Sequence, residues 1–226
     1  KDVEERYRKR YLDLLLNDDV RELFVKKSKF WDVVRSSLGK EGFLETETPV
    51  LESLPGGAEA EPFKTHHNAL NTDFYLRISL ELPLKKLLVG GYEKVFEIGR
   101  IFRNEGIDKE HLQDYTQMEC YWAYADYKDM MVLTQKIYKK VVKEIFGELK
   151  TKSGDHVIDW DTKWPLVDYY EVFKKETGKN YTEIDPVELD DFYKKEVRAK
   201  IAGPMFLTHY PESIMPLAKL KEDNPK

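Results

Sequence analysis

Residues 114–126 read DYTQMECYWAYAD, and this segment decides the fold class because it has the two-residue period of a strand. Successive side chains of a strand point to opposite faces. One face is therefore expected to carry Tyr115, Gln117, Glu119, Tyr121 and Ala123. The carboxylate at Glu119 lies among aromatic residues, which is unusual for a strand that contributes to a core.

The segment before it, FEIGRIFRNEG at residues 96–106, begins like a strand and ends in charged residues. Ordinary turns favour Gly, Pro, Asn, Asp and Ser. Here the turn follows Ile101 and Phe102 and begins with Arg103, Asn104 and Glu105. The pattern predicts a buried strand that is followed directly by an arginine and a glutamate.

Outward from this pair, the chain alternates between helical and extended patterns. Helices are expected at residues 20–38, 80–91, 126–145, 165–178 and 186–201, and further strands at 43–50, 74–79, 156–160 and 205–210. Residues 53–73 are expected to form a long loop. No linker interrupts the chain, so we expect one α+β domain with strands in hairpins and helices outside.

Composition excludes several classes of protein. The net charge is −5, with 41% hydrophobic and 35% charged residues, which is typical of a globular chain and not of a uniformly basic nucleic-acid binder. The single cysteine, Cys120, allows no internal disulfide and fits a reducing cytoplasm. No apolar run is long enough to span a bilayer and no signal peptide is visible, so no membrane association is expected.

Three charged residues fall where a core is expected, namely Glu81, Arg103 and Glu119. Burying an unpaired carboxylate is costly, so we expect a polar pocket in the sheet. Arginine matches phosphate or carboxylate, and two acids would accept a cation. Simpler interpretations are a turn salt bridge between Arg103 and Glu105, and a core Lys or Arg paired with Glu119.

Other motifs are weak or absent. His66 and His67 are adjacent and would point to opposite faces of a strand, and no spacing typical of zinc sites accompanies them. There is no phosphate-binding GxxxxGK[ST], no GxGxxG and no nucleophile elbow. No metal site is therefore expected within this chain.

Several long strings together resemble the class II aminoacyl-tRNA synthetases and, within them, the lysyl-tRNA synthetases. GFLETETPVL is similar to motif 1, and FRNEG followed by DYTQMECYWAYADY is similar to motif 2. The lysyl-type strings are RYLDLL, PGGAEAEPFKTHHNAL, VGGYEKVFEIGRIFRNEGI, MECYWAYADY and YPESIMPLAK. The resemblance implies a mostly antiparallel sheet flanked by helices.

By this resemblance, residues 1–226 form a partial catalytic domain, with motif 1 at about 20–50, motif 2 at about 92–125 and an intervening segment at 150–205. Motif 3, the Mg²⁺ ligands and the rest of the lysine pocket are expected beyond Lys226, and an anticodon-binding OB domain before Lys1. The chain alone is expected to be inactive. Motif 1 implies a homodimer with Pro49 at its interface.

The resemblance also implies the roles of individual residues in ATP binding. Arg103 matches the arginine that grips the ATP α-phosphate and the amino-acid carboxylate. Glu105 matches the contact to the adenine amino group, His111 lies on the motif 2 loop near the phosphates, and Tyr115 holds the place of the residue that stacks on adenine.

For lysine, the resemblance assigns Glu81 and the backbone of Gly57 to the α-amino group, and Glu119 with Tyr121 to the ε-ammonium group. The implied reaction is activation of lysine with ATP to lysyl-adenylate, followed by transfer to tRNA(Lys). ATP is a substrate and Mg²⁺ is expected as the metal. The interpretation from the residues agrees, because Tyr115, Glu119 and Tyr121 share one face of one strand.

The chain departs from the family pattern at two places. The family usually has Ala-Pro before the glutamate that matches Glu81 and a tyrosine two residues after it, where this chain has Ser79, Leu80 and Pro83. Its motif 2 loop usually reads Asn-Pro-Glu after the histidine, where this chain has Leu112, Gln113 and Asp114.

Three alternatives remain open at this point. One is a synthetase paralogue that lysylates a protein, and another is a non-catalytic dimerisation or RNA-binding module. The third is aspartyl or asparaginyl specificity, suggested by HLQDYTQ, which would need a cation in the side-chain pocket where Glu119 and Tyr121 stand.

Overall fold

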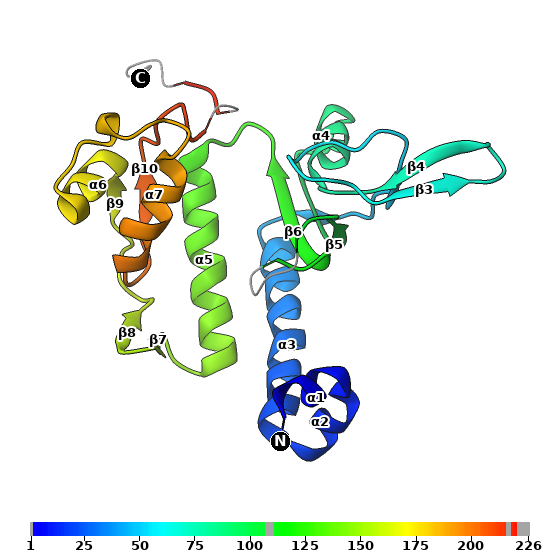
Figure 1. Cartoon of the computed structure of the whole chain (residues 1–226), viewed down its shortest axis with the longest axis horizontal. Coiled ribbons are helices and arrows are strands. Elements are labelled where there is room, and N and C mark those ends of the chain that lie inside the picture. Colours follow the sequence, from blue (N-terminus) through cyan, green and yellow to red (C-terminus); the bar gives the residue numbers. More distant parts are fainter. Residues whose placement is uncertain (1, 107–110, 216–217, 221–226) are drawn as a thin grey trace. The chain divides into compact units, whose positions relative to one another are not determined.

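A computed structural model of the chain describes residues 2–106, 111–215 and 218–220 (Figure 1). The chain divides into two compact units, Lys1–Leu133 and Thr134–Lys226. Each unit has a buried cluster of its own. Residues 107–110, which fall within the predicted motif 2, lie outside the described residues.

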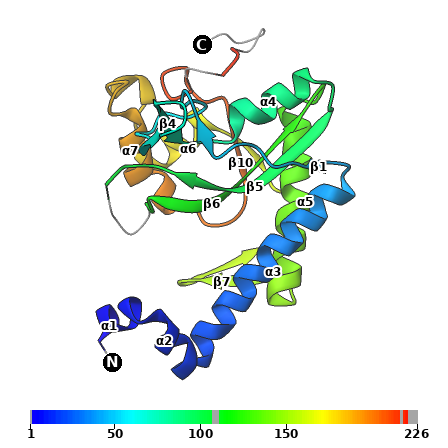
Figure 2. The ribbon, with the colours of Figure 1, turned by 90° about the vertical axis from the view of Figure 1, so that its right-hand side faces the viewer.

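The first unit is organised around the two strands that the sequence predicts. β5 (Lys94–Phe102) pairs antiparallel with β6 (Asp114–Trp122), and Glu97 lies opposite Glu119 in the register. The short strand β1 (Leu44–Glu45) adds to the other edge of β5 in parallel (Figure 2). The predominance of antiparallel pairing, with helices alongside, confirms the predicted α+β class.

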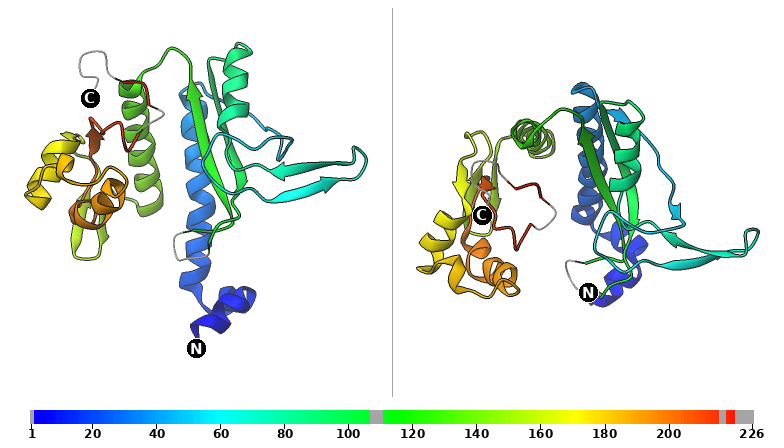
Figure 3. Two further views of the ribbon diagram at one scale, coloured as in Figure 1. Left: turned by 45° about the horizontal axis from the view of Figure 1, so that its top comes forward. Right: turned by 90° about the horizontal axis from the view of Figure 1, so that it is seen from above.

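Two helices accompany this sheet. α4 (Glu81–Val89) has Pro83 in its first turn and ends before Gly90 and Gly91, and it buries Leu84 completely in the cluster beneath it. α3 (Asp18–Lys40) runs beside the β5–β6 hairpin in both views of Figure 3. Its buried apolar positions are Val20 in the first turn and Val33, Val34 and Leu38 in the second half.

A buried ion pair ties the sheet to the chain around it. Arg77 and Glu97 are paired at 2.6 Å with side chains that are 4% and 5% exposed. The Arg77 Nε donates to the carbonyl of Arg100 and its Nη1 donates to that of Thr48, while Glu97 Oε2 accepts from the Thr48 amide and hydroxyl. A Cβ on Gly99 would lie 2.2 Å from the Arg77 guanidinium, so that position requires glycine.

A second sheet corrects two predictions. β4 (Thr72–Leu76) pairs antiparallel with both β2 (Leu51–Glu52) and β3 (Lys64–His67), so the stretch predicted as a loop contains a strand of the hairpin. The predicted strand 43–50 is interrupted after residue 45, because Thr48 bonds to Glu97 and Arg77 instead of continuing the ladder. Figure 1 shows the β3–β4 ribbon extending away from β5 and β6.

The charge-dense start of the chain forms two short helices, α1 (Val3–Arg8) and α2 (Arg10–Leu16), which the sequence analysis did not predict. Asp13 is buried between them and accepts hydrogen bonds from Arg6 at 2.7 Å, Asn17 at 2.6 Å and Arg10. The Arg6 hydrogen bond lowers the pKa of the Asp13 carboxyl.

The second unit begins within α5 (Tyr127–Phe146), a predicted helix whose N-terminus is capped by the Asp126 carboxylate. The other elements are β7 (Lys150–Ser153), β8 (His156–Asp159), β9 (Leu166–Asp168), α6 (Tyr169–Thr177), η1 (Tyr181–Glu183), α7 (Leu189–Glu196), η2 (Arg198–Lys200) and β10 (Phe206–Thr208). β7 pairs antiparallel with β8, and β9 pairs parallel with β10. The core of this unit is the aromatic and aliphatic cluster between α6 and α7.

Two predicted helices of this unit are shorter than expected. Residues 166–168 of the predicted helix 165–178 form β9, and Asp168 caps α6 by accepting from the amides of Tyr170 and Glu171. The predicted helix 186–201 is α-helical only over Leu189–Glu196, and the 3-10 turn η2 follows it. β7 was not predicted at all.

No helix in the described parts of the chain has the length and apolar character required to cross a bilayer.

Replacing Glu97 with glutamine should lower the free energy of unfolding by about 3–5 kcal/mol, because it leaves the Arg77 cation buried without its counter-charge. Glu45→Gln is the matched control, since Glu45 pairs with Arg35 at 2.8 Å with side chains 39% and 44% exposed, and we expect about 1 kcal/mol or less there. Urea denaturation of both variants measures the difference. Equal losses would show that the buried pair has no special role.

Candidate active site

Glu119 is the centre of the candidate site and is held by four neutral donors. Its Oε1 accepts from the Ser79 hydroxyl at 3.1 Å, the Leu80 amide at 3.0 Å and the Gln117 amide nitrogen at 2.6 Å. Its Oε2 accepts from the Tyr121 hydroxyl at 2.8 Å. No Lys or Arg of the described residues pairs with Glu119, so this part of the chain does not show the core cation of the simpler interpretation.

Tyr121 lies on the same face of β6 as Glu119, as the period of the strand predicts. Burial and the hydrogen bond to the Glu119 carboxylate raise the pKa of the Tyr121 phenol far above its ordinary value. The phenol therefore stays protonated at neutral pH and continues to donate to Glu119.

Ser79 connects Glu119 to the second acid of the site. The Ser79 hydroxyl accepts from the amide of Glu81 at 3.0 Å and donates to Glu119. Ser79 and Leu80 are the two positions where the chain departs from the Ala-Pro of the family pattern. Both departures supply a donor to Glu119, since proline has no amide hydrogen and alanine has no hydroxyl.

Gly57 packs against this connection. Its backbone has φ = +83°, and a Cβ there would lie 3.0 Å from both the Ser79 Oγ and the Glu81 Cβ. The structure thus brings Gly57, Glu81 and Glu119 together around the Ser79 hydroxyl, and Tyr121 joins them through Glu119.

Arg103 follows β5 and adjoins the same segment. Its backbone amide donates to Gln113 at 2.8 Å, which closes the turn, and its Nε donates to the carbonyl of Ile78 at 3.4 Å. Its guanidinium lies 5.8 Å from the centre of the Tyr115 ring. Within the described residues Arg103 forms no ion pair with Glu105, so the predicted turn salt bridge is not found there.

The four residues predicted to bind ATP share one pocket of about 290 Å³. Its lining consists of Arg103, Glu105, Gly106, His111, Leu112, Gln113 and Tyr115. Glu105 and His111 are exposed, whereas Arg103 and Tyr115 are half-buried. A cation, an aromatic ring and an acid around one hollow are suited to a phosphate ester that carries an aromatic base.

Pro49 lies elsewhere, in a hollow of about 810 Å³ that contains none of the other predicted site residues. Its apolar lining includes Leu44, Leu51 and Leu54, which are 47%, 46% and 80% exposed.

The adjacent histidines His66 and His67, at which no metal site is expected, both lie on β3. His66 Nδ1 lies 3.0 Å from Asp73 in the β3–β4 hairpin. Within the described residues, no three His, Cys, Asp or Glu side chains come together in a way that would hold a metal ion.

Sequence analysis missed Ser79, Gln117, Arg77 and Glu97. Arg77 and Glu97 are charged residues inside apolar strand patterns. A charge among apolar residues is also the feature by which Glu81 and Glu119 were predicted as site residues. Ser79 gave no such signal, since a serine before a helix is ordinarily a cap.

Comparison with known proteins identifies the family. Residues 2–226 match the family described as tRNA synthetases class II (D, K and N). The chain belongs to this family. Among class II synthetases it is 42% identical over 248 residues to the lysine–tRNA ligase of Halalkalibacterium halodurans, and 43% over 247 residues to that of Dehalococcoides mccartyi. The Bacillus subtilis lysine–tRNA ligase is 40% identical over 248 residues.

Each of these alignments covers 100% of this chain and 50% of the relative. The chain thus spans about half the length of the curated relatives it matches. Class II synthetases use ATP, and the match agrees with the resemblance found in the sequence.

Replacing Gly57 with alanine should destabilise the chain more than the same change at Gly91. Both glycines have positive φ, +83° and +101°, so both variants incur a backbone cost of about 1–3 kcal/mol. Only at Gly57 does the new methyl group meet Ser79 and Glu81, which should add about 1–3 kcal/mol. Urea denaturation provides the comparison, and identical losses would mean that the close packing around Ser79 is absent in solution.

Cys120 tests the face assignment of β6. Burial, with a smaller contribution from the Glu119 charge, raises the pKa of the Cys120 thiol to about 11. An ordinary thiol has a pKa of about 8.5, so at pH 8 alkylation of the folded chain should be slower than that of the denatured chain by about 100-fold or more. Iodoacetamide labelling followed by mass spectrometry measures both rates. Similar rates would place Cys120 on the exposed face and contradict the orientation of Glu119.

Proposed function

We propose that the protein to which this chain belongs activates lysine with ATP to lysyl-adenylate and transfers the lysyl group to tRNA(Lys). Residues outside this chain are needed for the complete reaction, and the chain alone is inactive. The observation that carries the proposal is the position of Glu119, a half-buried carboxylate that is held by neutral donors only.

The geometry of Glu119 suits a single ammonium group. Three donors occupy its Oε1, whereas among the described residues its Oε2 accepts only from Tyr121. A carboxylate offers about four lone-pair sites, so Oε2 retains room for one more donor. The ε-ammonium group of lysine would bind there, beside the Tyr121 hydroxyl, and a neutral side chain of similar length would leave the charge unpaired.

Glu81 would receive the α-ammonium group of the same lysine molecule. It starts α4, it is linked to Glu119 through Ser79, and its side chain is 34% exposed and so open to a ligand. Gly57, in contact with both Ser79 and Glu81, would present its backbone to the amine without a side chain in the way.

Arg103 would bind the lysine carboxylate and the ATP α-phosphate. Its Nε contacts Ile78, the residue before Ser79, so the guanidinium adjoins the proposed lysine site while it lines the proposed ATP pocket. The carboxylate oxygen attacks the α-phosphorus in line and pyrophosphate leaves. Arg103 would stabilise the developing charge and align the reactants. Tyr115 would stack on adenine, with Glu105 near its amino group and His111 near the phosphates.

Aspartyl or asparaginyl specificity would need a cation in place of the acid. In the described residues the side chains around Glu119 are neutral donors, which favours lysine. The curated relatives with lysine–tRNA ligase names agree with this choice.

The proposal extends to assembly and location. Pro49 and its apolar surroundings, together with exposed Leu23, Phe24, Val25 and Phe30 of α3, support a homodimer through motif 1. Mg²⁺ would be held by ligands beyond residue 226. The single cysteine supports a cytoplasmic location.

Lysine-dependent ATP–pyrophosphate exchange tests the function in the full-length protein. Arg103→Ala should lower the rate by about 10²–10³-fold, as loss of a donor to developing charge does. Glu119→Gln should raise the KM for lysine by about 10–100-fold, because a charge-assisted hydrogen bond is lost.

Arg100→Ala is the control, since Arg100 lies on β5 three residues before Arg103, is exposed and pairs with Asp114. It should exchange like the wild type. Absence of exchange in the full-length wild type with every standard amino acid would contradict lysine activation and favour a paralogue or a binding module.

A further inference from the structure

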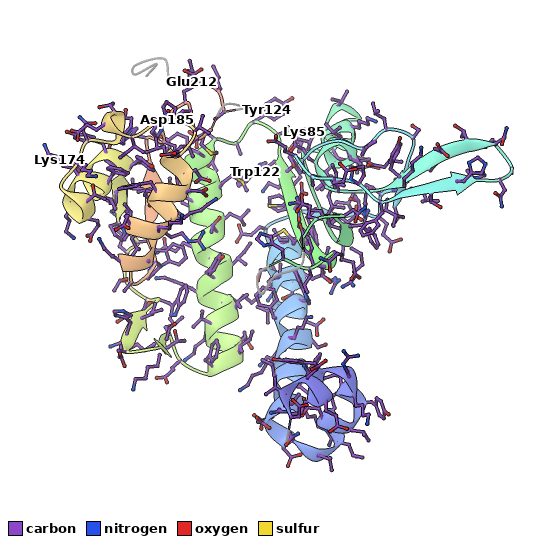
Figure 4. The ribbon with its side chains drawn as sticks, viewed as in Figure 1. Lys85, Trp122, Tyr124, Lys174, Asp185 and Glu212 are labelled. Atoms are coloured by element: carbon purple, nitrogen blue, oxygen red, sulfur yellow. The ribbon has the colours of Figure 1, made fainter. Side chains whose placement is uncertain are left out.

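Lys85 places an ammonium group of the protein itself at the candidate lysine site. It lies on α4 one turn after Glu81, on the side of the helix that faces the end of β6 (Figure 4). Its Nζ is 2.7 Å from Glu81 Oε1. The same Nζ lies 5.9 Å from the centre of the Tyr121 ring.

This arrangement differs from an ordinary pair on a helix surface. Lys194 and Asp190 of α7 have the same four-residue spacing at 2.6 Å, and their side chains are 49% and 52% exposed. Lys85 and Glu81 are similarly spaced, but here the ammonium also approaches the aromatic ring whose hydroxyl donates to Glu119. Lys85 therefore contacts residues from both halves of the proposed lysine site.

We propose that Lys85 is an internal counter-ion which occupies Glu81 while the site is empty and which the α-ammonium group of the substrate displaces. The inference rests on the proposed function, because it assigns the amino-acid amine to Glu81. Lys85 is a positioning and specificity residue in this scheme and takes no part in the chemical step.

The physical reason for displacement is repulsion between like charges. One carboxylate has enough lone pairs for two ammonium groups, but bringing both to Glu81 sets two cations side by side. The Lys85 pair is half-exposed and therefore weak, so a ligand with several further contacts can replace it. A simple amine that lacks those contacts would gain too little, and Lys85 thereby protects Glu81 from adventitious amines.

The inference predicts a gain of affinity on mutation. Lys85→Met in the full-length protein removes the competitor and should tighten binding of lysine by about 1.5–5-fold, which corresponds to the range measured for exposed ion pairs. 6-Aminohexanoate has the carboxylate and the terminal amine of lysine but no α-amine. It has no need to displace Lys85, so its dissociation constant should stay unchanged. Titration calorimetry with each ligand provides both values.

Two further variants serve as controls. Lys85→Arg keeps the cation and should bind lysine like the wild type, and Lys194→Met removes the matched helix-surface lysine and should do the same. The inference would be overturned if Lys85→Met bound lysine no more tightly than the wild type, or if lysine and 6-aminohexanoate changed equally. As long as the wild type binds lysine, those results leave the proposed function intact. A wild-type protein that binds no lysine would overturn both.

Discussion

The buried pair of Arg77 and Glu97 is the interaction on which the rest of the site depends. Arg77 is the first residue after β4, and its guanidinium reaches β5 and the chain at Thr48 at the same time. With Arg77 fixed, the next residues have little freedom. Ile78 accepts from Arg103, and Ser79 and Leu80 donate to Glu119, before Glu81 begins α4. A single segment of five residues, 77–81, thus contacts Glu97, Glu119 and Arg103 and supplies Glu81.

Charge is distributed in the site according to depth. The deep pair is neutralised inside the protein, because an unpaired charge at 4–5% exposure would be very costly. Glu119 is only half-buried and is stabilised by oriented dipoles, which lower the cost of its charge without cancelling it. The side chains of Glu81 and Lys85 are 34% and 53% exposed, so water screens their attraction. The charge that remains available to a ligand is therefore negative on the α4 side and positive at Arg103.

The sequence predicted those parts of the site that depend on local sequence patterns, such as the alternation of side chains along a strand. The two-residue alternation of β6 placed Glu119, Tyr121 and Tyr115 on one face, and Pro83 with the glycine pair placed α4. It did not predict the pairing of Arg77 with Glu97, which are 20 residues apart and meet only through strand pairing. Nor did it predict β3, because KTHH has no apolar alternation and becomes a strand by pairing with β4.

Ser79 and Leu80 belong together as one change from the family pattern. Glu119 Oε1 accepts from Ser79, Leu80 and Gln117. With an alanine and a proline at the first two positions, only the Gln117 donor of these three would remain. In this chain the hydroxyl and the amide hydrogen fill that oxygen, so a ligand cation finds acceptor capacity only at Oε2, next to Tyr121. More donors stabilise the ionised carboxylate and at the same time weaken its attraction for any further donor. Under the proposed function, the two substitutions would trade strength of cation binding for a fixed direction of approach, and that direction would separate the two amines of lysine between Glu81 and Glu119.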